Sequence, residues 1–189
     1  MANFNIAYQR TIIKIEGEYN PGNGEAETYR GIDRGANPKW PGWAIIDAIK
    51  KESPGISVAR MNAALAANTQ LQADIQSFYK ANYWDVLSLD AVSSQIKANA
   101  LFDCSVNPCI IGVVKAAQIA CNAIKQKSVS VDGDFGALTL ACINALDEKL
   151  FDLAFCAVRQ ANYYERTRLT PSASQWLSSW LFRSARQLS

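Results

Sequence analysis

Residues 3–32 read NFNIAYQRTIIKIEGEYNPGNGEAETYRGI, and the first half of this stretch has the pattern of an amphipathic helix. Its large apolar side chains recur every three or four residues, at Phe4, Tyr8, Ile12 and Ile15. This spacing predicts a helix over about residues 3 to 16, and Gly17 is a typical stop for it. Glu16 lies four residues beyond Ile12, so its carboxylate falls on the apolar stripe at the carboxyl end of the helix.

The segment after this helix has a different composition. Glycine, proline and asparagine are dense between about residues 17 and 42, which predicts a long loop or a short hairpin there. Beyond it the apolar spacing is helical again, and strand-like alternation is almost absent, so we expect a mainly α protein. The helices expected there cover about residues 42–52, 57–67, 68–87, 93–107, 110–126, 137–146, 148–167 and 174–187.

Composition excludes several classes of partner. The chain has 189 residues, 49% of them hydrophobic, and no apolar run approaches the roughly 18 residues of a membrane span, so we expect no stable membrane insertion. The net charge is +2, and no basic cluster exceeds the pair Lys50 and Lys51, which argues against nucleic acid. The start of the sequence lacks the continuous apolar core of a secretory signal, so we expect either that the sequence begins after processing or that export uses another route.

The absence of histidine excludes Ser-His-Asp and Cys-His nucleophilic catalysis and most catalytic zinc sites. The five cysteines contain no CxxC motif, so we expect small buried thiols on helices, with Cys104 and Cys109 the first candidates for a disulfide. The segment VDGDFG carries Asp132 and Asp134 but lacks the later ligands of a calcium loop. Helix capping and a glycine turn explain it better, and we expect neither metal nor cofactor.

Glu16 has the placement of a general acid. Burial and the negative end of a helix both disfavour a carboxylate anion, and a carboxyl that keeps its proton can donate it to a leaving group. Glycoside hydrolysis requires such an acid and a second polar group. Glu25 and Glu27 follow nine and eleven residues later, in a segment able to fold back. On spacing alone a solvated glutamate at a helix end is the commoner outcome.

Several motifs, in order along the chain, resemble the glycoside hydrolase family 108 muramidases, some of which have been labelled secretion activators. These are EGEY, ETYRGI, NPKWPGW and FYKANYWDVL in the first half, and ALFDCSVN at residues 100–107. In the second half, VDGDFGALTLACINAL and WLSSWLFR resemble the predicted peptidoglycan-binding domain that commonly follows. Its marks fall on Asp132, Gly133, Gly136, Thr139, Trp180, Leu181 and Arg183.

The resemblance implies a lysozyme-like helical fold that cleaves the glycan backbone of peptidoglycan, in the periplasm or outside the cell. It implies a muramidase-type catalytic region over residues 1–92 and a helical peptidoglycan-binding region over 93–189. We expect the two to pack as one compact unit, because a helical lobe of about 90 residues with a long polar loop buries little on its own. Glu16 takes the position of the catalytic glutamate, as general acid. Glu27 and Thr28 take the position of a pair that positions water or supports the substrate. By analogy with phage lysozymes, Glu25 is the rival second carboxylate.

The sequence departs from the family pattern at the loop. Glu18 replaces the second glycine of E-G-G-Y, Asn23 replaces an aspartate, and Glu25-Ala26 replaces a pair of glycines. A non-catalytic peptidoglycan-binding or secretion-accessory protein is therefore the alternative, and a helical interaction protein without a glycan partner is a third.

Further side chains are candidates for substrate binding. Aromatic rings can stack on sugars or pack the loop onto the helices, and both roles remain open for Tyr19, Tyr29, Trp40 and Trp43. Asn107 could reach a cleft or cap the helix before Pro108.

Overall fold

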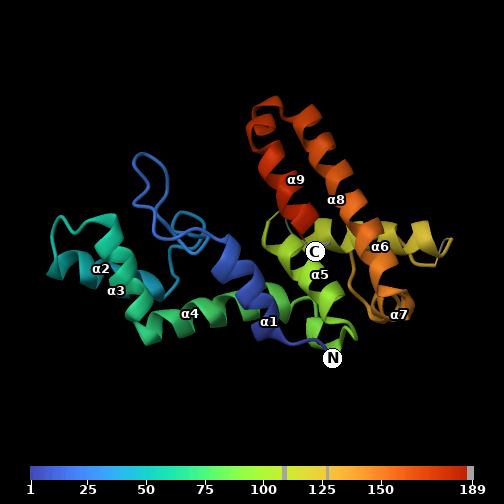
Figure 1. Cartoon of the computed structure of the whole chain (residues 1–189), viewed down its shortest axis with the longest axis horizontal. Helices are drawn as coiled ribbons and strands as arrows, with labels where there is room; N and C mark the ends of the chain where they lie inside the picture. Colours follow the sequence, from blue (N-terminus) through green and yellow to red (C-terminus); the bar gives the residue numbers. More distant parts are fainter. Residues whose placement is uncertain (108–109, 127, 187–189) are drawn as a thin grey trace. The chain divides into compact units, whose positions relative to one another are not determined.

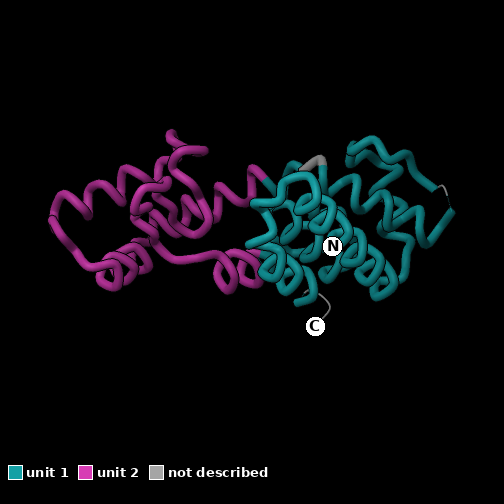
Figure 2. Tube along the Cα trace, turned by 90° about the horizontal axis from the view of Figure 1, so that it is seen from above, with its two compact units in different colours: residues 1–7, 83–189 teal, residues 8–82 magenta. Residues whose placement is uncertain are grey.

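The computed structural model describes residues 1–107, 110–126 and 128–186, with the backbone alone for residues 110 and 111. Helices dominate the chain, as predicted (Figure 1). The chain divides into two compact units (Figure 2). The hairpin unit is Tyr8–Asn82, and the helical unit is Met1–Ala7 with Tyr83–Ser189. None of the helices within the described ranges is both long and apolar enough to cross a membrane.

The predicted first helix is present, but its middle is wider than an α-helix. Helix α1 spans Phe4–Tyr8, and the π-helical turn η1 follows over Gln9–Ile13. Helical backbone continues to residue 15, and the chain bends at Glu16. A π turn holds more residues per turn than an α turn, and such turns occur often beside functional sites.

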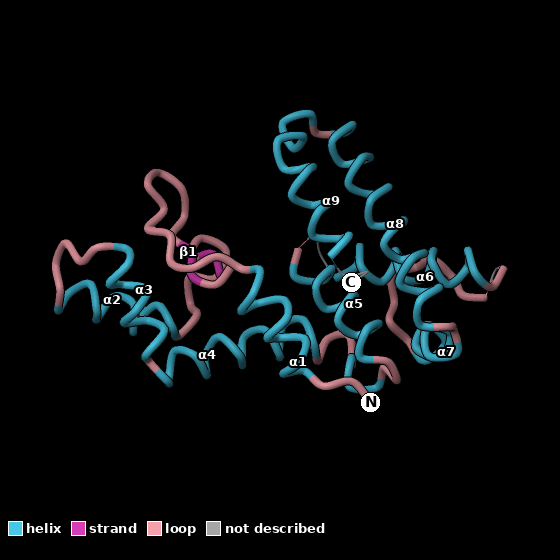
Figure 3. Tube along the Cα trace, viewed as in Figure 1, coloured by secondary structure: helices cyan, strands magenta, loops and turns pink. Residues whose placement is uncertain are grey.

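The loop carries the short hairpin that its composition predicted (Figure 3). Strands β1, Thr28–Tyr29, and β2, Ile32–Asp33, pair antiparallel, and Asn20 adds a backbone bridge to Thr28. The two residues between the strands, Arg30 and Gly31, have φ angles of 49° and 78°. Positive φ at both central positions is the geometry that matches a two-residue turn to the twist of a hairpin.

Three helices complete the hairpin unit: α2 (Gly42–Glu52), α3 (Val58–Ala67) and α4 (Thr69–Tyr79), which runs into the π-helical turn η2 (Lys80–Trp84). The Ser57 hydroxyl caps α3 and the Asn68 side-chain oxygen caps α4. Residues at helical spacing fill the core of the unit, namely Ile46, Met61, Leu65, Leu71 and Ile75.

The helical unit contains the other predicted helices. They are α5 (Gln95–Val106), α6 (Ile110–Ile124), α7 (Ala137–Ala145), α8 (Glu148–Leu169) and α9 (Leu177–Ala185). Short 3-10 turns cover Leu89–Ala91, before α5, and Pro171–Trp176, before α9. The predicted end of the last helix, at residue 187, lies outside the described residues.

A buried ion-pair network ties three helices of this unit together. Asp103 on α5 is fully buried, and its two oxygens accept from Arg159 on α8 at 3.0 Å and from Arg183 on α9 at 2.9 Å. Removing one partner of such a network leaves a buried charge, which strongly destabilises a protein. Asp103 of the ALFDCSVN segment and Arg183 of the WLSSWLFR segment thus have a structural role.

The VDGDFG loop is organised around the buried side chain of Gln118. Its amide nitrogen donates to the Asp132 carboxylate at 2.7 Å and its oxygen accepts from the backbone N–H of Gly133 at 3.0 Å. The glycine turn is confirmed, with φ of 87° at Gly133. The predicted helix capping is wrong, because Gly136 is the first boundary residue of α7 and no side chain caps that end.

The prediction of buried thiols is confirmed for the cysteines that the structure describes, Cys104, Cys121, Cys142 and Cys156. Burial raises the pKa of Cys121 to about 12, so its thiol is unreactive near neutral pH. The predicted disulfide between Cys104 and Cys109 is not tested, because Cys109 lies outside the described residues.

Candidate active site

Glu16 lies where the first helix ends, and the tip of the hairpin packs against it. The Glu16 side chain is half-buried, whereas Gly31 at the hairpin turn is exposed. A methyl group added to Gly31 would stand 2.6 Å from Glu16 Oε2 and 2.9 Å from the Tyr79 hydroxyl. Glycine therefore allows the backbone of the turn to approach a carboxylate that lies near the protein surface.

The turn is fixed to the first helix and to α4. The Tyr79 hydroxyl donates to the backbone carbonyl of Arg30 at 2.6 Å. The Arg30 guanidinium makes a longer bond, 3.4 Å, to the carbonyl of Ile13 in the last turn of the first helix, where a cation is favourable. Burial raises the pKa of nearby Tyr8 to about 12, although Arg30 opposes the shift. The turn against Glu16 is thus held by the Tyr79 hydroxyl from α4 and by the bond of Arg30 to the first helix.

The Glu27 carboxylate is held by ion pairs and a hydrogen bond. Its side chain is only 10% exposed and contacts two cations, Lys50 at 2.5 Å and Arg34 at 2.6 Å. The Tyr19 hydroxyl donates to it at 2.6 Å. Burial alone would raise the pKa of Glu27, but the bonds from Lys50, Tyr19 and Arg34 outweigh it and hold that pKa below its ordinary value. Glu27 is thus ionised near neutral pH.

Arg34 carries the network on to α2. Its guanidinium donates to both oxygens of Asp47, at 2.8 and 2.5 Å, and lies over the ring of Trp43, 5.1 Å from its centre. Arg34 holds the pKa of Asp47 below its ordinary value, a shift that burial opposes. Glu27 directly precedes β1, Arg34 directly follows β2, and Asp47 lies on α2, so this network fixes the hairpin to the helix.

The remaining predicted residues of the loop differ in exposure. Glu25 is exposed, and its backbone N–H closes a tight turn to the carbonyl of Gly22 at 2.6 Å. Thr28 is half-buried, and its backbone exchanges two hydrogen bonds with Asn20. Tyr19 is buried and holds Glu27, as described above. The catalytic roles of Glu25, Glu27 and Thr28 remain predictions.

The predicted sugar-binding aromatic residues are largely packed. Tyr29 and Trp43 are 1% and 3% exposed, and the indole N–H of Trp43 donates to the carbonyl of Asn37 at 2.8 Å. Trp40 packs edge-on to Trp43, with ring centres 5.1 Å apart. A methyl group at Gly42 would lie 2.2 Å from the Trp40 ring, so glycine is required beside it. These contacts support packing, and the sugar-binding role remains a prediction.

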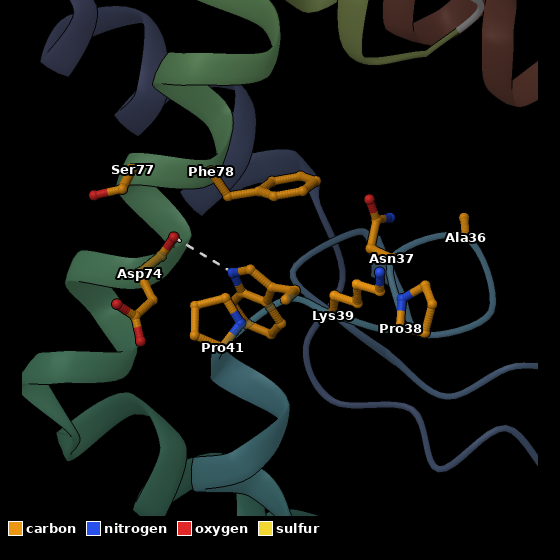
Figure 4. Close-up of a pocket in the computed structure, with 9 residues that line it drawn as sticks. Ala36, Asn37, Pro38, Lys39, Pro41, Asp74, Ser77 and Phe78 are labelled. Carbon is orange, nitrogen blue, oxygen red and sulfur yellow. Dashed lines mark hydrogen bonds between the residues drawn. The ribbon is translucent and has the colours of Figure 1, made fainter.

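A surface pocket of about 530 Å³ adjoins the Trp40 side chain (Figure 4). Its wall combines apolar faces with polar groups, from Ala36, Asn37, Pro38, Lys39, Trp40, Pro41, Asp74, Ser77 and Phe78. The dashed line in Figure 4 marks the long, 3.5 Å bond from the Trp40 indole to the carbonyl of Asp74. Such mixed lining is typical of ligand pockets. Phe78, in the wall of this pocket, precedes Tyr79 on α4, and the two rings pack edge-on with their centres 5.3 Å apart.

Asn107 belongs to the helical unit, whereas the other predicted site residues belong to the hairpin unit. It is the last boundary residue of α5, and its backbone N–H donates to the carbonyl of Cys104 at 3.2 Å. This position agrees with helix termination, and a contact with substrate remains a prediction.

Several residues of this site were not predicted, namely Arg30, Gly31, Arg34, Asp47, Lys50 and Tyr79. Arg-Gly between two short strand-like segments is a weak signal for a two-residue turn, since Asn-Gly and Asp-Gly are the strong ones. Nothing in the sequence around Lys50 or Tyr79 indicates that they reach the loop, because these contacts join segments far apart along the chain.

Comparison with known proteins agrees with this architecture. The sequence model of the family described as Glycosyl hydrolase 108 matches residues 9–108, just over half of the chain. Among solved structures, that of Brucella abortus SagA is similar, with 22% sequence identity and a TM-score of 0.57. The match covers 98% of this chain and 93% of SagA, and at this identity it concerns the fold. No curated protein matches the sequence.

Proposed function

The chain belongs to the glycosyl hydrolase 108 family, and from this premise we propose that it is a peptidoglycan hydrolase of the muramidase type. Glu16 is the proposed general acid, which protonates the glycosidic oxygen as the sugar leaves. The observation that supports this role is the contact of the Glu16 carboxylate with Gly31, beside the Tyr79 hydroxyl. The Glu16 side chain is half-buried at the end of the helix, so part of its surface is accessible to a substrate.

Glu27 is unsuited to the acid role. A general acid must hold a proton near the working pH, whereas the lowered pKa of Glu27 keeps it ionised. Its three donors, Tyr19, Arg34 and Lys50, leave it a supporting role. Through them Glu27 fixes the strand that leads to the turn against Glu16.

The second catalytic group remains a choice between Glu25 and Glu27, with Thr28 beside them. The exposure of Glu25 favours it as the group that accepts a proton from water, because Glu27 is already neutralised by two cations. We propose Glu25 as the base, Glu27 as the support of the loop, and Thr28 as a contact that positions water.

Substrate contacts are proposed at the pocket beside Trp40. Apolar faces next to polar groups suit a sugar, whose ring presents an apolar face rimmed by hydroxyls. Residues 1–92 are proposed as the catalytic region and residues 93–189 as a peptidoglycan-binding region. Cell-wall substrate implies action in the periplasm or outside the cell.

Clearing of a peptidoglycan suspension by wild type and by Glu16→Gln tests the proposal. Loss of a positioned general acid lowers the rate by about 10²–10⁴-fold, so Glu16→Gln should clear at least about a hundredfold more slowly. Glu18→Gln is the matched control, since it makes the same change at an exposed glutamate two residues away, which accepts from Asn62. Equal rates for wild type and Glu16→Gln would refute the acid assignment.

A non-catalytic peptidoglycan-binding or secretion-accessory protein is the alternative. The departures at Glu18, Asn23 and Glu25-Ala26 motivate it, because they lie in the loop that leads to the hairpin. Wild-type protein that sediments with insoluble peptidoglycan but releases no sugar ends would establish this alternative.

A further inference from the structure

A second pocket, of about 220 Å³, lies within the helical unit. One face of α8 forms its wall, with residues at positions i, i+3, i+4 and i+7: Arg159, Asn162, Tyr163 and Arg166. Cys104 on α5 and the small residues Gly112 and Ala116 on α6 complete it. Small side chains on α6 leave room opposite the two arginines, where α5, α6 and α8 pack together (Figure 1).

The charged residues that line this pocket are all positive. Arg159 and Arg166 both line the pocket, and no acidic residue does so in the described part of the chain. Asp103 does not line the pocket, and its single negative charge is shared between two arginines, Arg159 and Arg183. The pocket therefore presents a positive potential to whatever enters it.

Arg159 has a hydrogen-bond donor to spare. It is 2% exposed, and its bonds to Asp103 and to the Tyr163 hydroxyl, both 3.0 Å, come from the same nitrogen, Nη2. Its Nε–H is buried without a hydrogen-bond partner among the residues that the structure describes. Buried N–H groups are nearly always paired, so the unpaired Nε–H leaves Arg159, a residue that lines the pocket, with one donor unused.

Arg166 is held at the mouth of the pocket. It is exposed, and its guanidinium lies over the Trp180 ring, 5.0 Å from the centre, while Trp180 packs against Tyr163 at 5.4 Å. Stacking restricts a long side chain, so less entropy is lost when it binds an anion. Two arginines on one helix face, one buried and one stacked, resemble a clamp for a planar anion.

We propose that this pocket binds a carboxylate group of the peptide stem of peptidoglycan. The inference rests on the proposed function, which supplies the polymer. Its volume is below that of a pocket for a whole drug-sized ligand, which suits one amino acid side chain or terminus of a longer molecule. A carboxylate fits the arginine fork through two parallel bonds, and Asn162 can contact the adjacent peptide group.

Titration calorimetry with two synthetic dipeptides tests this proposal on the full chain, at about 0.15 M salt so that distant charges are screened. The probes are L-Ala-D-Glu and its diamide, which has nearly the same shape and the same ammonium group but lacks the two carboxylate charges. Inorganic phosphate is the third probe. We expect the acid to bind at least about tenfold more tightly than the diamide, the difference typical of a charged hydrogen bond.

Arg166→Gln should weaken binding of the acid by about tenfold and leave the diamide unchanged. Arg168→Gln is the matched control, because it removes the same charge from an exposed residue of α8 that does not line the pocket and pairs with Glu165. Arg159→Lys retains the charge beside Asp103 but loses the planar fork, and it should also weaken binding of the acid. Because Arg166 is exposed, its variant keeps the test valid if Arg159→Lys fails to fold.

Three results would overturn the proposal: equal affinity for the acid and the diamide, equal losses in Arg166→Gln and Arg168→Gln, or binding of phosphate alone. Clearing of peptidoglycan by wild type, measured beside binding of the acid, separates this outcome from the catalytic one. If wild type clears peptidoglycan but does not bind the acid, only the pocket assignment fails. If wild type binds the acid but does not clear peptidoglycan, the catalytic proposal fails and the pocket assignment stands.

Discussion

The backbone of Gly31 is in direct contact with the carboxylate of Glu16. No side chain larger than hydrogen fits between them, because a methyl group there would lie 2.6 Å from Glu16 Oε2. Gly31 also has φ of 78°, which other residues adopt at a cost. Two separate demands, one steric and one conformational, thus meet at one position beside the proposed acid.

Gly31→Ala should lower both stability and activity. The conformational strain costs about 1–2 kcal/mol in the free energy of unfolding, and displacement of Glu16 and Tyr79 adds to it. Since a misplaced catalytic group can cost about a hundredfold in rate, we expect peptidoglycan clearing to fall by a similar factor. Urea unfolding and clearing assays measure the two effects.

Gly24→Ala is the control for Gly31→Ala. Gly24 has φ of 105° in the same loop, but a methyl group there would have nothing within 4 Å. It should therefore show the conformational cost alone, with clearing near the wild-type rate. Equal losses of activity in the two variants would show that contact with Glu16 is not what matters.

Tyr79→Phe tests how much the hydrogen bond that holds the hairpin turn contributes to stability, without changing the residues of the turn itself. The variant removes the 2.6 Å bond to the carbonyl of Arg30 and leaves that acceptor unsatisfied, at a cost of about 1–3 kcal/mol in the free energy of unfolding. Tyr29→Phe is the control, because the Tyr29 hydroxyl accepts only a 3.3 Å bond from Gln72, which also donates to Leu65. A larger loss in Tyr29→Phe would contradict this account of the turn.

The helices could be predicted because each depends on local information. Apolar spacing and the Gly-Pro breaks, such as Ser53-Pro54-Gly55, mark where they begin and end. The π-helical turn at Gln9–Ile13 was missed, because apolar residues three to four apart are compatible with either kind of helix over so short a stretch.

The surroundings of the site were less predictable than its glutamate. Glu16 could be proposed from a helix end and a motif, both readable in one short stretch. Lys50 and Tyr79 come from α2 and α4, and only the tertiary packing of those helices brings them to the loop. Glu27 was proposed for chemistry, whereas its ion pairs indicate that it supports the loop.

Glu27→Gln should therefore act on stability and on its pH dependence. Near pH 7 the loss of two ion pairs and weakening of the Tyr19 bond should cost about 1–3 kcal/mol, reduced by the partial exposure of Arg34 and Lys50. Because the pKa of Glu27 is lower in the folded chain than its ordinary 4.5, its contribution is complete above that value and is lost as the pH falls below it. The difference between wild type and variant should shrink in that range.

Urea unfolding at a series of pH values measures this difference. Glu25→Gln is the matched control, an exposed glutamate in the same loop, for which we expect a change within about 0.5 kcal/mol near pH 7. Clearing assays on the two variants also test the second catalytic group. If Glu27→Gln retains its fold but clears as slowly as Glu16→Gln, whereas Glu25→Gln clears normally, the roles proposed for Glu25 and Glu27 must be exchanged.

Phe78→Ala tests the pocket beside Trp40 as the substrate contact. Phe78 is half-buried and lines the pocket, and its ring packs edge-on to the neighbouring Tyr79, with centres 5.3 Å apart. If the ring contacts sugar in both the bound and the transition state, its loss should raise KM with little change in kcat. Phe78→Tyr retains the ring and should keep KM near wild type. A fall in kcat with unchanged KM in Phe78→Ala would instead show that Phe78 acts on Glu16 through Tyr79. If both constants stayed unchanged, the pocket would have no part in substrate binding.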